Sequence, residues 1–123
     1  MCILLVEDEP LIRSIMADEF LDAGFRVIEA QDGDEAIAIL ADPPIRFTLL
    51  VTDINMPGEA DGMAVAARLR RDTRGGVPVI FTTGHPESLD RLRAMGGAEH
   101  IIPKPYSPAK LVALARQLTG QAA

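Results

Sequence analysis

Short apolar runs alternate along the chain with segments whose apolar residues recur at helical spacing. The apolar runs cover residues 2–6, 25–30, 47–52, 77–81 and 100–102. The helical segments cover residues 11–23, 34–41, 62–71 and 86–95, and a fifth follows Ser107-Pro108. Such alternation predicts an α/β fold of the (βα)5 type, a doubly wound sheet of five parallel strands with helices on both faces.

Residues at the ends of these segments support the assignment. Pro10 suits the first turn of a helix, where its missing N–H would be unpaired anyway. Gly24 suits a helix C-cap, Asp32-Gly33 is typical of a turn, and Ser107 suits an N-cap. The run at 47–52 lacks alternation of polar and apolar residues, which predicts a strand buried on both faces.

Composition narrows the class of protein. The chain has 123 residues, 48% hydrophobic and 24% charged, as expected for one globular domain. No apolar run could cross a bilayer and no signal peptide is visible, so we expect a cytoplasmic protein. A net charge of −6 argues against binding nucleic acid. Cys2, the single cysteine, cannot form an internal disulfide and is expected to be a buried thiol.

Charged and polar residues follow four of the five predicted strands. Glu7 and Asp8 follow the first strand, Asp53 the third, Thr83 the fourth and Lys104 the fifth. Ligands of open α/β sheets bind outside the carboxyl ends of the strands. We therefore expect three carboxylates, a hydroxyl and an ammonium group to face one crevice.

Clustered carboxylates favour a bound cation, because without one they raise each other's pKa. Oxygen ligands without cysteine or histidine favour a hard ion, so we expect Mg²⁺, with Mn²⁺ as an alternative. A carboxylate beside such an ion can attack a phosphoryl group and form an acyl phosphate. The predicted chemistry is therefore phosphoryl transfer to an aspartate.

Four blocks of sequence resemble the signatures of response-regulator receiver domains, in the same order and over essentially the whole chain. The blocks are Val6-Glu7-Asp8-Glu9-Pro10, Asp53-Ile54-Asn55-Met56-Pro57-Gly58, Thr82-Thr83-Gly84 and Pro103-Lys104-Pro105-Tyr106. The resemblance implies the flavodoxin-like strand order 2-1-3-4-5. It also implies Asp53 as the phosphoacceptor.

The resemblance assigns metal ligands to four positions. Asp8 and Asp53 would bind Mg²⁺, Glu7 would hold it largely through water, and the main-chain carbonyl of Asn55 would be a further ligand. Thr83 would donate a hydrogen bond to the phosphoryl group.

The resemblance also assigns a role to Lys104, whose ammonium group would pair with the phosphoryl group. The peptide bond between Lys104 and Pro105 is often cis in this family, so it is a candidate for that isomer.

The resemblance implies a receiver that takes phosphoryl from a sensor histidine kinase or a histidine phosphotransfer protein. It would catalyse only its own phosphorylation and dephosphorylation, so we do not expect an enzyme in the wider sense. It would switch binding to a downstream protein, with no nucleic acid or membrane partner, as a monomer or a weak dimer. Residues 86–95, the fifth strand, the last helix and Tyr106 would form the output surface.

Two positions depart from the common pattern of the family. Ile101, three residues before Lys104, replaces an aromatic residue that in many receivers turns inward on activation. The loop at 58–62 is about one residue longer than usual. These departures bear on how the signal leaves the domain rather than on the phosphorylation chemistry.

Other charged residues have simpler explanations. Arg68, Arg70, Arg71 and Arg74 lie near a helix end, where a solvated cationic face is expected. His85 lies two residues after Thr83 and is interpreted as a loop residue that could influence the phosphoryl lifetime.

Several alternatives remain open. Residues 1–123 are expected to be one receiver domain without an output domain, but a receiver cut from a hybrid kinase or larger regulator has the same sequence features. An Mg²⁺-dependent aspartyl phosphohydrolase usually has a second aspartate where this chain has Asn55, and also needs a capping insertion. A flavodoxin-like cofactor carrier would need a phosphate-binding loop. A constitutive binding module would not need the acidic residues and the lysine.

Overall fold

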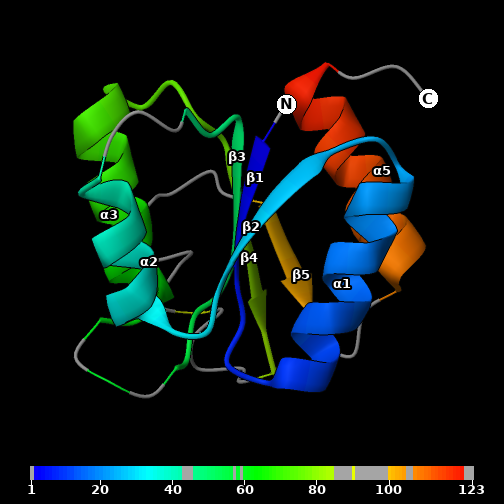
Figure 1. The fold of residues 1–123 in the computed structure, drawn as a ribbon, viewed down its shortest axis with the longest axis horizontal. Helices are drawn as coiled ribbons and strands as arrows, with labels where there is room; N and C mark the ends of the chain where they lie inside the picture. Colours follow the sequence, from blue (N-terminus) through cyan, green and yellow to red (C-terminus); the bar gives the residue numbers. More distant parts are fainter. Residues whose placement is uncertain are drawn as a thin grey trace.

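All five strands run in the same direction and form one sheet in the order β2-β1-β3-β4-β5 (Figure 1). The structure is a computed structural model that describes residues 2–42, 46–56, 58, 60–84, 90, 100–104 and 107–120. The strands are β1 (Cys2–Val6), β2 (Arg26–Ala30), β3 (Leu49–Asp53), β4 (Val79–Thr83) and β5 (His100–Pro103). The predicted fold class and strand order are confirmed.

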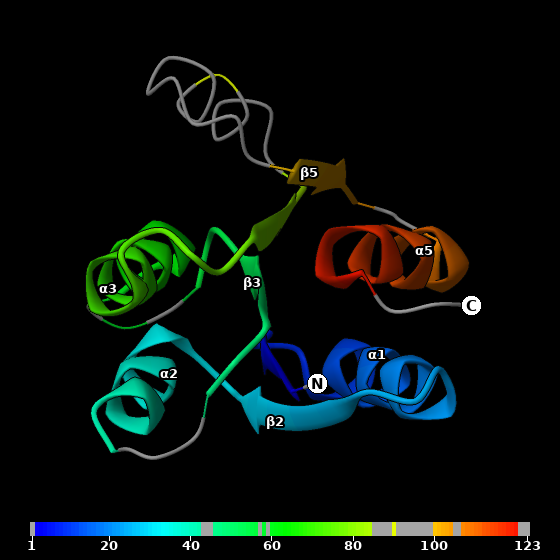
Figure 2. The same cartoon turned by 90° about the horizontal axis from the view of Figure 1, so that it is seen from above.

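In the part of the chain that the structure describes, four helices cover the sheet in two layers. They are α1 (Pro10–Asp22), α2 (Gly33–Leu40), α3 (Gly62–Thr73) and α5 (Pro108–Thr119). Seen from above, α2 and α3 lie on one face of the sheet and α1 and α5 on the other (Figure 2). The predicted helix at 86–95 lies outside the described residues, apart from residue 90.

The helix ends agree with the sequence prediction except in two details. Pro10 and Pro108 occupy the first helical positions as expected. Asp32 lies in the bend after β2 as predicted, but it is also the N-cap of α2, because its side chain accepts a hydrogen bond of 2.8 Å from the main-chain N–H of Glu35. Ser107 lies at the N-cap position of α5 but makes no capping hydrogen bond with its side chain.

Two apolar cores hold these layers together, one on each face of the sheet. Alternate residues of β1 enter opposite cores: Leu4 and Val6 pack with α2 and α3, whereas Ile3 and Leu5 pack with α1 and α5. Every residue of β3 and β4 is buried, which confirms the prediction of a strand buried on both faces. Full burial of each aliphatic side chain contributes about 1.5–3 kcal/mol to stability.

Cys2 differs from expectation because its position at the start of β1 leaves it only partly buried. Burial nonetheless raises the pKa of its thiol. In the part of the chain that the structure describes, no helix combines the length and apolar character needed to cross a membrane.

Candidate functional site

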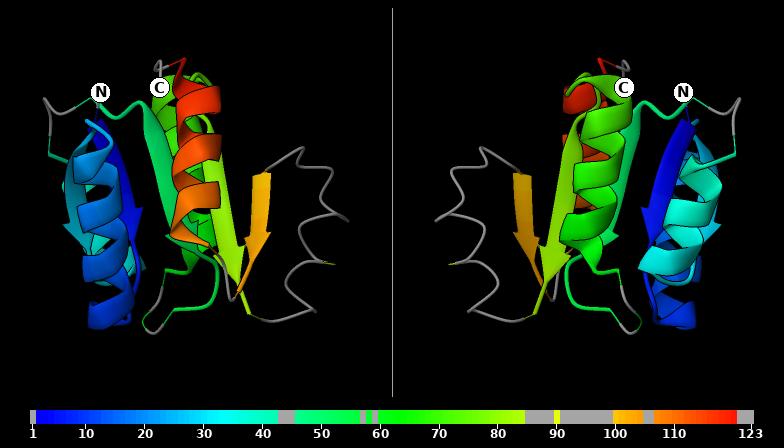
Figure 3. Two further views of the ribbon diagram at one scale, coloured as in Figure 1. Left: turned by 90° about the vertical axis from the view of Figure 1, so that its right-hand side faces the viewer. Right: turned by 90° about the vertical axis from the view of Figure 1, so that its left-hand side faces the viewer.

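The predicted site residues meet at the carboxyl edge of the sheet, toward which all the strands point (Figure 3). The strand register places Asp53 opposite Thr82 on β4, and Thr83 opposite Pro103 on β5. Glu7 directly follows β1, and its N–H donates to the carbonyl of Ala30 at 3.1 Å. Parallel pairing therefore brings together residues that are far apart in the sequence.

Three carboxylates form the centre of this edge. Glu7, Asp8 and Asp53 each offer a carboxylate oxygen, and these oxygens lie within 4.8 Å of one another. Glu7 is only 2% exposed and Asp53 only 5%, whereas Asp8 is half-buried. Charges this close and this buried repel strongly unless a cation lies among them.

The ammonium group of Lys104 lies against two of these carboxylates. Its Nζ is 2.7 Å from Oδ2 of Asp53 and 3.3 Å from Oε2 of Glu7. The main-chain N–H of Lys104 donates to the carbonyl of Thr83 at 2.8 Å, which fixes the base of the side chain. The lysine predicted from the sequence is thus paired directly with the predicted phosphoacceptor.

Burial and charge shift the proton affinities of this cluster. Burial raises the pKa of Glu7 to about 7, and the charge of Asp53 adds to the rise, while Lys104 opposes it. For Lys104, burial alone would lower the pKa, but the hydrogen bond from its ammonium to Asp53 and the charges of Asp53 and Glu7 raise it overall. Lys104 is therefore charged at neutral pH, and Glu7 titrates close to that pH.

A hydroxyl and an amide complete the edge. The side-chain amide of Asn55 donates to Oγ1 of Thr83 at 3.4 Å, and the main-chain N–H of Asn55 donates to Oδ1 of Asp53 at 3.3 Å. Thr83, the last residue of β4, is buried. The sequence predicted a role for the main-chain carbonyl of Asn55, but the contact between its side chain and Thr83 was not foreseen.

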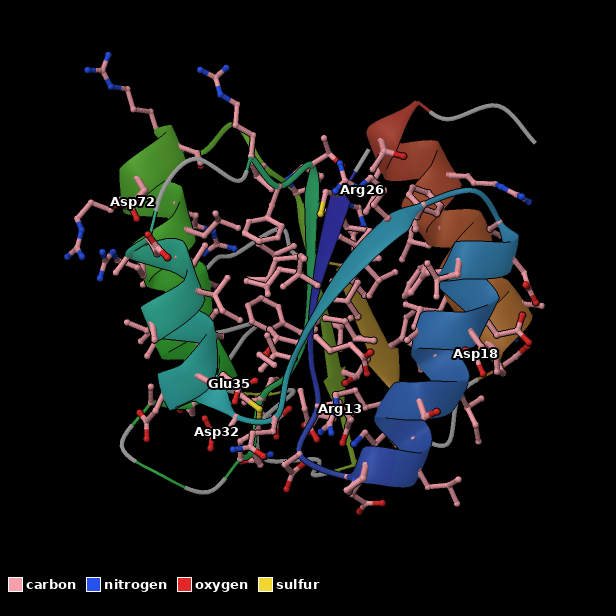
Figure 4. All side chains as sticks on the ribbon, in the orientation of Figure 1. Arg13, Asp18, Arg26, Asp32, Glu35 and Asp72 are labelled. Atoms are coloured by element: carbon pink, nitrogen blue, oxygen red, sulfur yellow. The ribbon has the colours of Figure 1, made fainter. Side chains whose placement is uncertain are left out.

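Arg13 supports the acidic segment and was also missed in the sequence. Its guanidinium donates to the main-chain carbonyl of Glu7 at 2.8 Å and forms an ion pair of 3.4 Å with Glu29. Figure 4 shows Arg13 at the end of the molecule where α1 begins. The sequence feature that could have indicated this role is the position of Arg13, one turn into the helix that follows the acidic residues. A long cationic side chain there can reach back to the end of the strand.

The donor set fits a hard divalent cation. All three clustered side chains are carboxylates, and the cluster is buried enough that an added positive charge would be stabilised. Lys104 supplies one positive charge to this cluster. Three carboxylates with one ammonium leave an excess of negative charge when all are ionised.

Comparison with known proteins identifies the family. The sequence model of the response regulator receiver domain matches residues 3–116. The chain belongs to this receiver family. Its fold, the acidic cluster and the resemblance seen in the sequence agree with that membership.

Individual relatives show the extent of the similarity. The aerobic respiration control protein ArcA of Escherichia coli K12 is 37% identical over 117 residues, which are 94% of this chain and 47% of ArcA. This receiver therefore spans about half the length of that relative. A response regulator receiver protein from Sinorhizobium medicae WSM419 superposes with a TM-score of 0.86 at 29% identity, covering 98% of this chain and 95% of the other.

A second similar structure was solved with a ligand. The response regulator TrrA from Thermotoga maritima, in complex with Mg²⁺ and BeF, has a TM-score of 0.78 and 26% identity, covering 95% of this chain and 97% of TrrA.

Other positions singled out in the sequence have mixed outcomes. Ile101 is half-buried and packs on the core beside α2 and α3. Arg71 and Arg74 are exposed, as expected for a solvated face, whereas Arg68 and Arg70 are half-buried. Arg68 forms an ion pair of 2.9 Å with Asp72. His85, Pro105 and Tyr106 lie outside the described residues.

Proposed function

We propose that this receiver domain accepts a phosphoryl group on Asp53. The observation that carries the proposal is the ion pair of 2.7 Å between Asp53 and Lys104 inside a cluster of three carboxylates. One carboxylate oxygen of Asp53 attacks the phosphorus of a phosphohistidine, and an O–P bond forms as the N–P bond breaks. The imidazole nitrogen keeps the electron pair of the broken bond.

Two groups of the chain support this transfer, one a cation and the other a neutral hydroxyl. The ammonium of Lys104 already lies against Asp53, so it is placed to balance the negative charge of the phosphoryl oxygens. The hydroxyl of Thr83 lies at the same edge and would donate to a phosphoryl oxygen. Hydrolysis reverses the modification: water attacks the phosphorus, the bond to Asp53 breaks, and phosphate leaves.

We propose that Glu7, Asp8, Asp53 and the main-chain carbonyl of Asn55 hold Mg²⁺, or Mn²⁺ in its place. The ion would supply charge neutralisation for the phosphoryl group. The cluster of carboxylate oxygens within 4.8 Å supports this assignment for the three acidic residues. The domain would catalyse only its own phosphorylation and dephosphorylation.

A protein donor is supported by an apolar pair beside the site. Leu11 and Ile15 lie one turn apart on α1 and are 73% and 46% exposed. Because α1 begins two residues after Asp8, a donor that reaches Asp53 must approach this end of the helix. We propose a sensor histidine kinase or a histidine phosphotransfer protein as the donor. We also propose that the domain acts as a monomer or weak dimer and that its downstream target is a protein.

The signal would pass to the downstream target through a shift between two conformers of the region formed by β4, β5 and α5. Thr83 ends β4, and Ile101 pairs with Phe81 across β4 and β5. A movement of Thr83 toward the phosphoryl group would change the packing of the adjacent β5. Ile101 would transmit the change by its packing rather than by an aromatic rotamer.

The test is uptake of phosphoryl from acetyl phosphate, or of beryllofluoride, with and without Mg²⁺. Intact mass and NMR would compare the wild-type chain with Asp53→Asn, which keeps the size of the side chain. We expect Mg²⁺-dependent modification that is lost in the variant. A folded wild-type protein that binds Mg²⁺ but takes up neither group would contradict the phosphoacceptor assignment.

A further inference from the structure

The loop between β3 and α3, residues 54–61, is closed at its base. The N–H of Gly62 donates to the carbonyl of Ile54 at 3.0 Å. A side chain at Gly62 would overlap the main-chain carbonyl of Asp53, so only glycine allows this close approach. The loop therefore leaves and re-enters the fold at one point, directly beside Asp53.

The part of this loop that leads into α3, which includes Gly58 and Ala60 and is called the far limb below, is anchored to the first turn of α2. Oδ1 of Asp34 accepts a hydrogen bond of 3.1 Å from the N–H of Ala60. Gly58 has a φ of +100°, and a Cβ there would lie 2.5 Å from Oδ2 of Asp34. A Cβ on Gly33 would overlap the carbonyl of Ala60, so α2 and the loop are in direct contact.

The near limb of the loop carries Asn55, which makes two long hydrogen bonds at the carboxyl edge. The N–H of Asn55 lies 3.3 Å from Asp53, and its side chain lies 3.4 Å from Thr83. Bonds of this length hold a backbone less firmly than those near 2.9 Å. Because Asn55 and Ala60 belong to the same loop, closed between Ile54 and Gly62, a shift at Ala60 would move the main chain at Asn55.

We propose that Asp34 is a positioning residue of the phosphoacceptor site. It holds the far limb of the loop against α2 and so keeps the main chain of Asn55 at the edge of the carboxylate cluster. The inference rests on the proposed function of Asp53 and adds a residue of α2 that lies outside the four signature blocks.

The test compares Asp34→Ala with Asp34→Asn and with Glu35→Ala. Glu35 is a matched control because it is also in the first turn of α2, where it accepts from the N–H of Gln31 at 3.3 Å. Both alanine variants remove one carboxylate from the helix N-terminus, so they lose the same interaction with the helix dipole. The probes are Mg²⁺ alone, followed by NMR titration, and the amide signals of Asn55 and Ala60 in metal-free protein.

We expect Asp34→Ala to weaken Mg²⁺ binding about fivefold, since changes to residues that orient ligands typically cost tenfold or more and Asp34 acts one step further away. The amide signal of Asn55 should shift in the same variant without metal. Asp34→Asn should stay close to wild type because its amide oxygen still accepts from Ala60. Gly58→Ala should also weaken Mg²⁺ binding, because its Cβ would displace the Asp34 carboxylate and its φ of +100° is unfavourable for alanine.

Equal effects of Asp34→Ala and Glu35→Ala would overturn the proposal, as would an unchanged Asn55 signal in Asp34→Ala. If the wild-type protein bound no Mg²⁺, the metal assignment would fall instead. The Asn55 signal in metal-free protein would then still decide whether Asp34 holds the loop.

Discussion

The two edges of the sheet hold their charges in opposite ways. At the carboxyl edge, Glu7 and Asp53 are almost fully buried and share one ammonium group, that of Lys104. At the amino edge, Arg68 and Asp72 form an ion pair whose side chains are 29% and 40% exposed. Figure 4 shows Asp72 far from Arg13, Asp32 and Glu35, which lie at the carboxyl end.

Water screens the exposed ion pair at the amino edge but not the buried charges at the carboxyl edge. An exposed ion pair contributes little to stability, because both partners are nearly as well solvated in the unfolded chain. Buried like charges are unfavourable unless a cation offsets them. The carboxyl edge therefore gives up stability to keep a site that favours an added cation, whereas the amino edge does not.

The largest expected effect comes from Lys104→Met, which removes the cation but keeps much of the side-chain volume. Without metal, the free energy of unfolding should fall by about 1–3 kcal/mol, because two buried carboxylates lose their partner. Phosphoryl uptake with Mg²⁺ should slow about 100-fold. Urea unfolding and intact mass measure the two effects.

Lys110→Met is the control, because Lys110 lies exposed on α5. An unfolding curve for Lys104→Met that matched this control would contradict the view that the buried pair stabilises the metal-free edge.

The next effect is a pH dependence caused by Glu7. Its pKa is about 7 in the folded protein against an ordinary value of 4.5, so the folded state binds the proton more tightly. Its contribution to stability is fully present below pH 4.5 and is lost as the pH rises to about 7. In EDTA, Glu7→Gln should therefore lose less stability than wild type over this range, by up to about 3 kcal/mol.

Thermal unfolding of both proteins at several pH values measures that difference. Parallel curves for wild type and Glu7→Gln would show that the Glu7 carboxyl does not titrate as inferred.

A smaller effect is expected at the N-terminal end of α1. Leu11→Ala should slow phosphotransfer from a phosphohistidine protein about threefold to tenfold, since burying one leucine in an interface typically contributes about 1 kcal/mol. Leu21→Ala is the matched control, because Leu21 is 54% exposed at the other end of the helix. Transfer from acetyl phosphate should be unchanged in both variants, and equal rates for both from the protein donor would exclude Leu11 from the docking surface.

The smallest effect is expected at the amino edge. Arg68→Ala should change the free energy of unfolding by less than about 0.5 kcal/mol, because its partner Asp72 stays solvated. Urea unfolding at low and high salt is the measurement. A loss comparable to that of Lys104→Met would remove the contrast between the two edges.

Much of this molecule was predictable from local sequence. The ends of α1 and α2 lie within one residue of the predicted segments, because Pro10, Gly24 and the apolar spacing act over one helical turn. The meeting of Asp53, Thr83 and Lys104 was also predicted, since parallel strands must end at one edge. The N-cap role of Asp32 was not predicted, because the same residue type favours both a turn and an N-cap.

The sequence by itself determined the alternation of strands and helices, the polar residues at the strand ends, and hence the family and the candidate chemistry. Only the tertiary structure decided that Arg13 reaches the carbonyl of Glu7 and that Asp34 accepts from Ala60. Periodicity and capping act between near neighbours in the chain, so they can be read from the residues alone. A hydrogen bond between a helix and a loop 26 residues away depends on how the layers pack, and no local pattern encodes that distance.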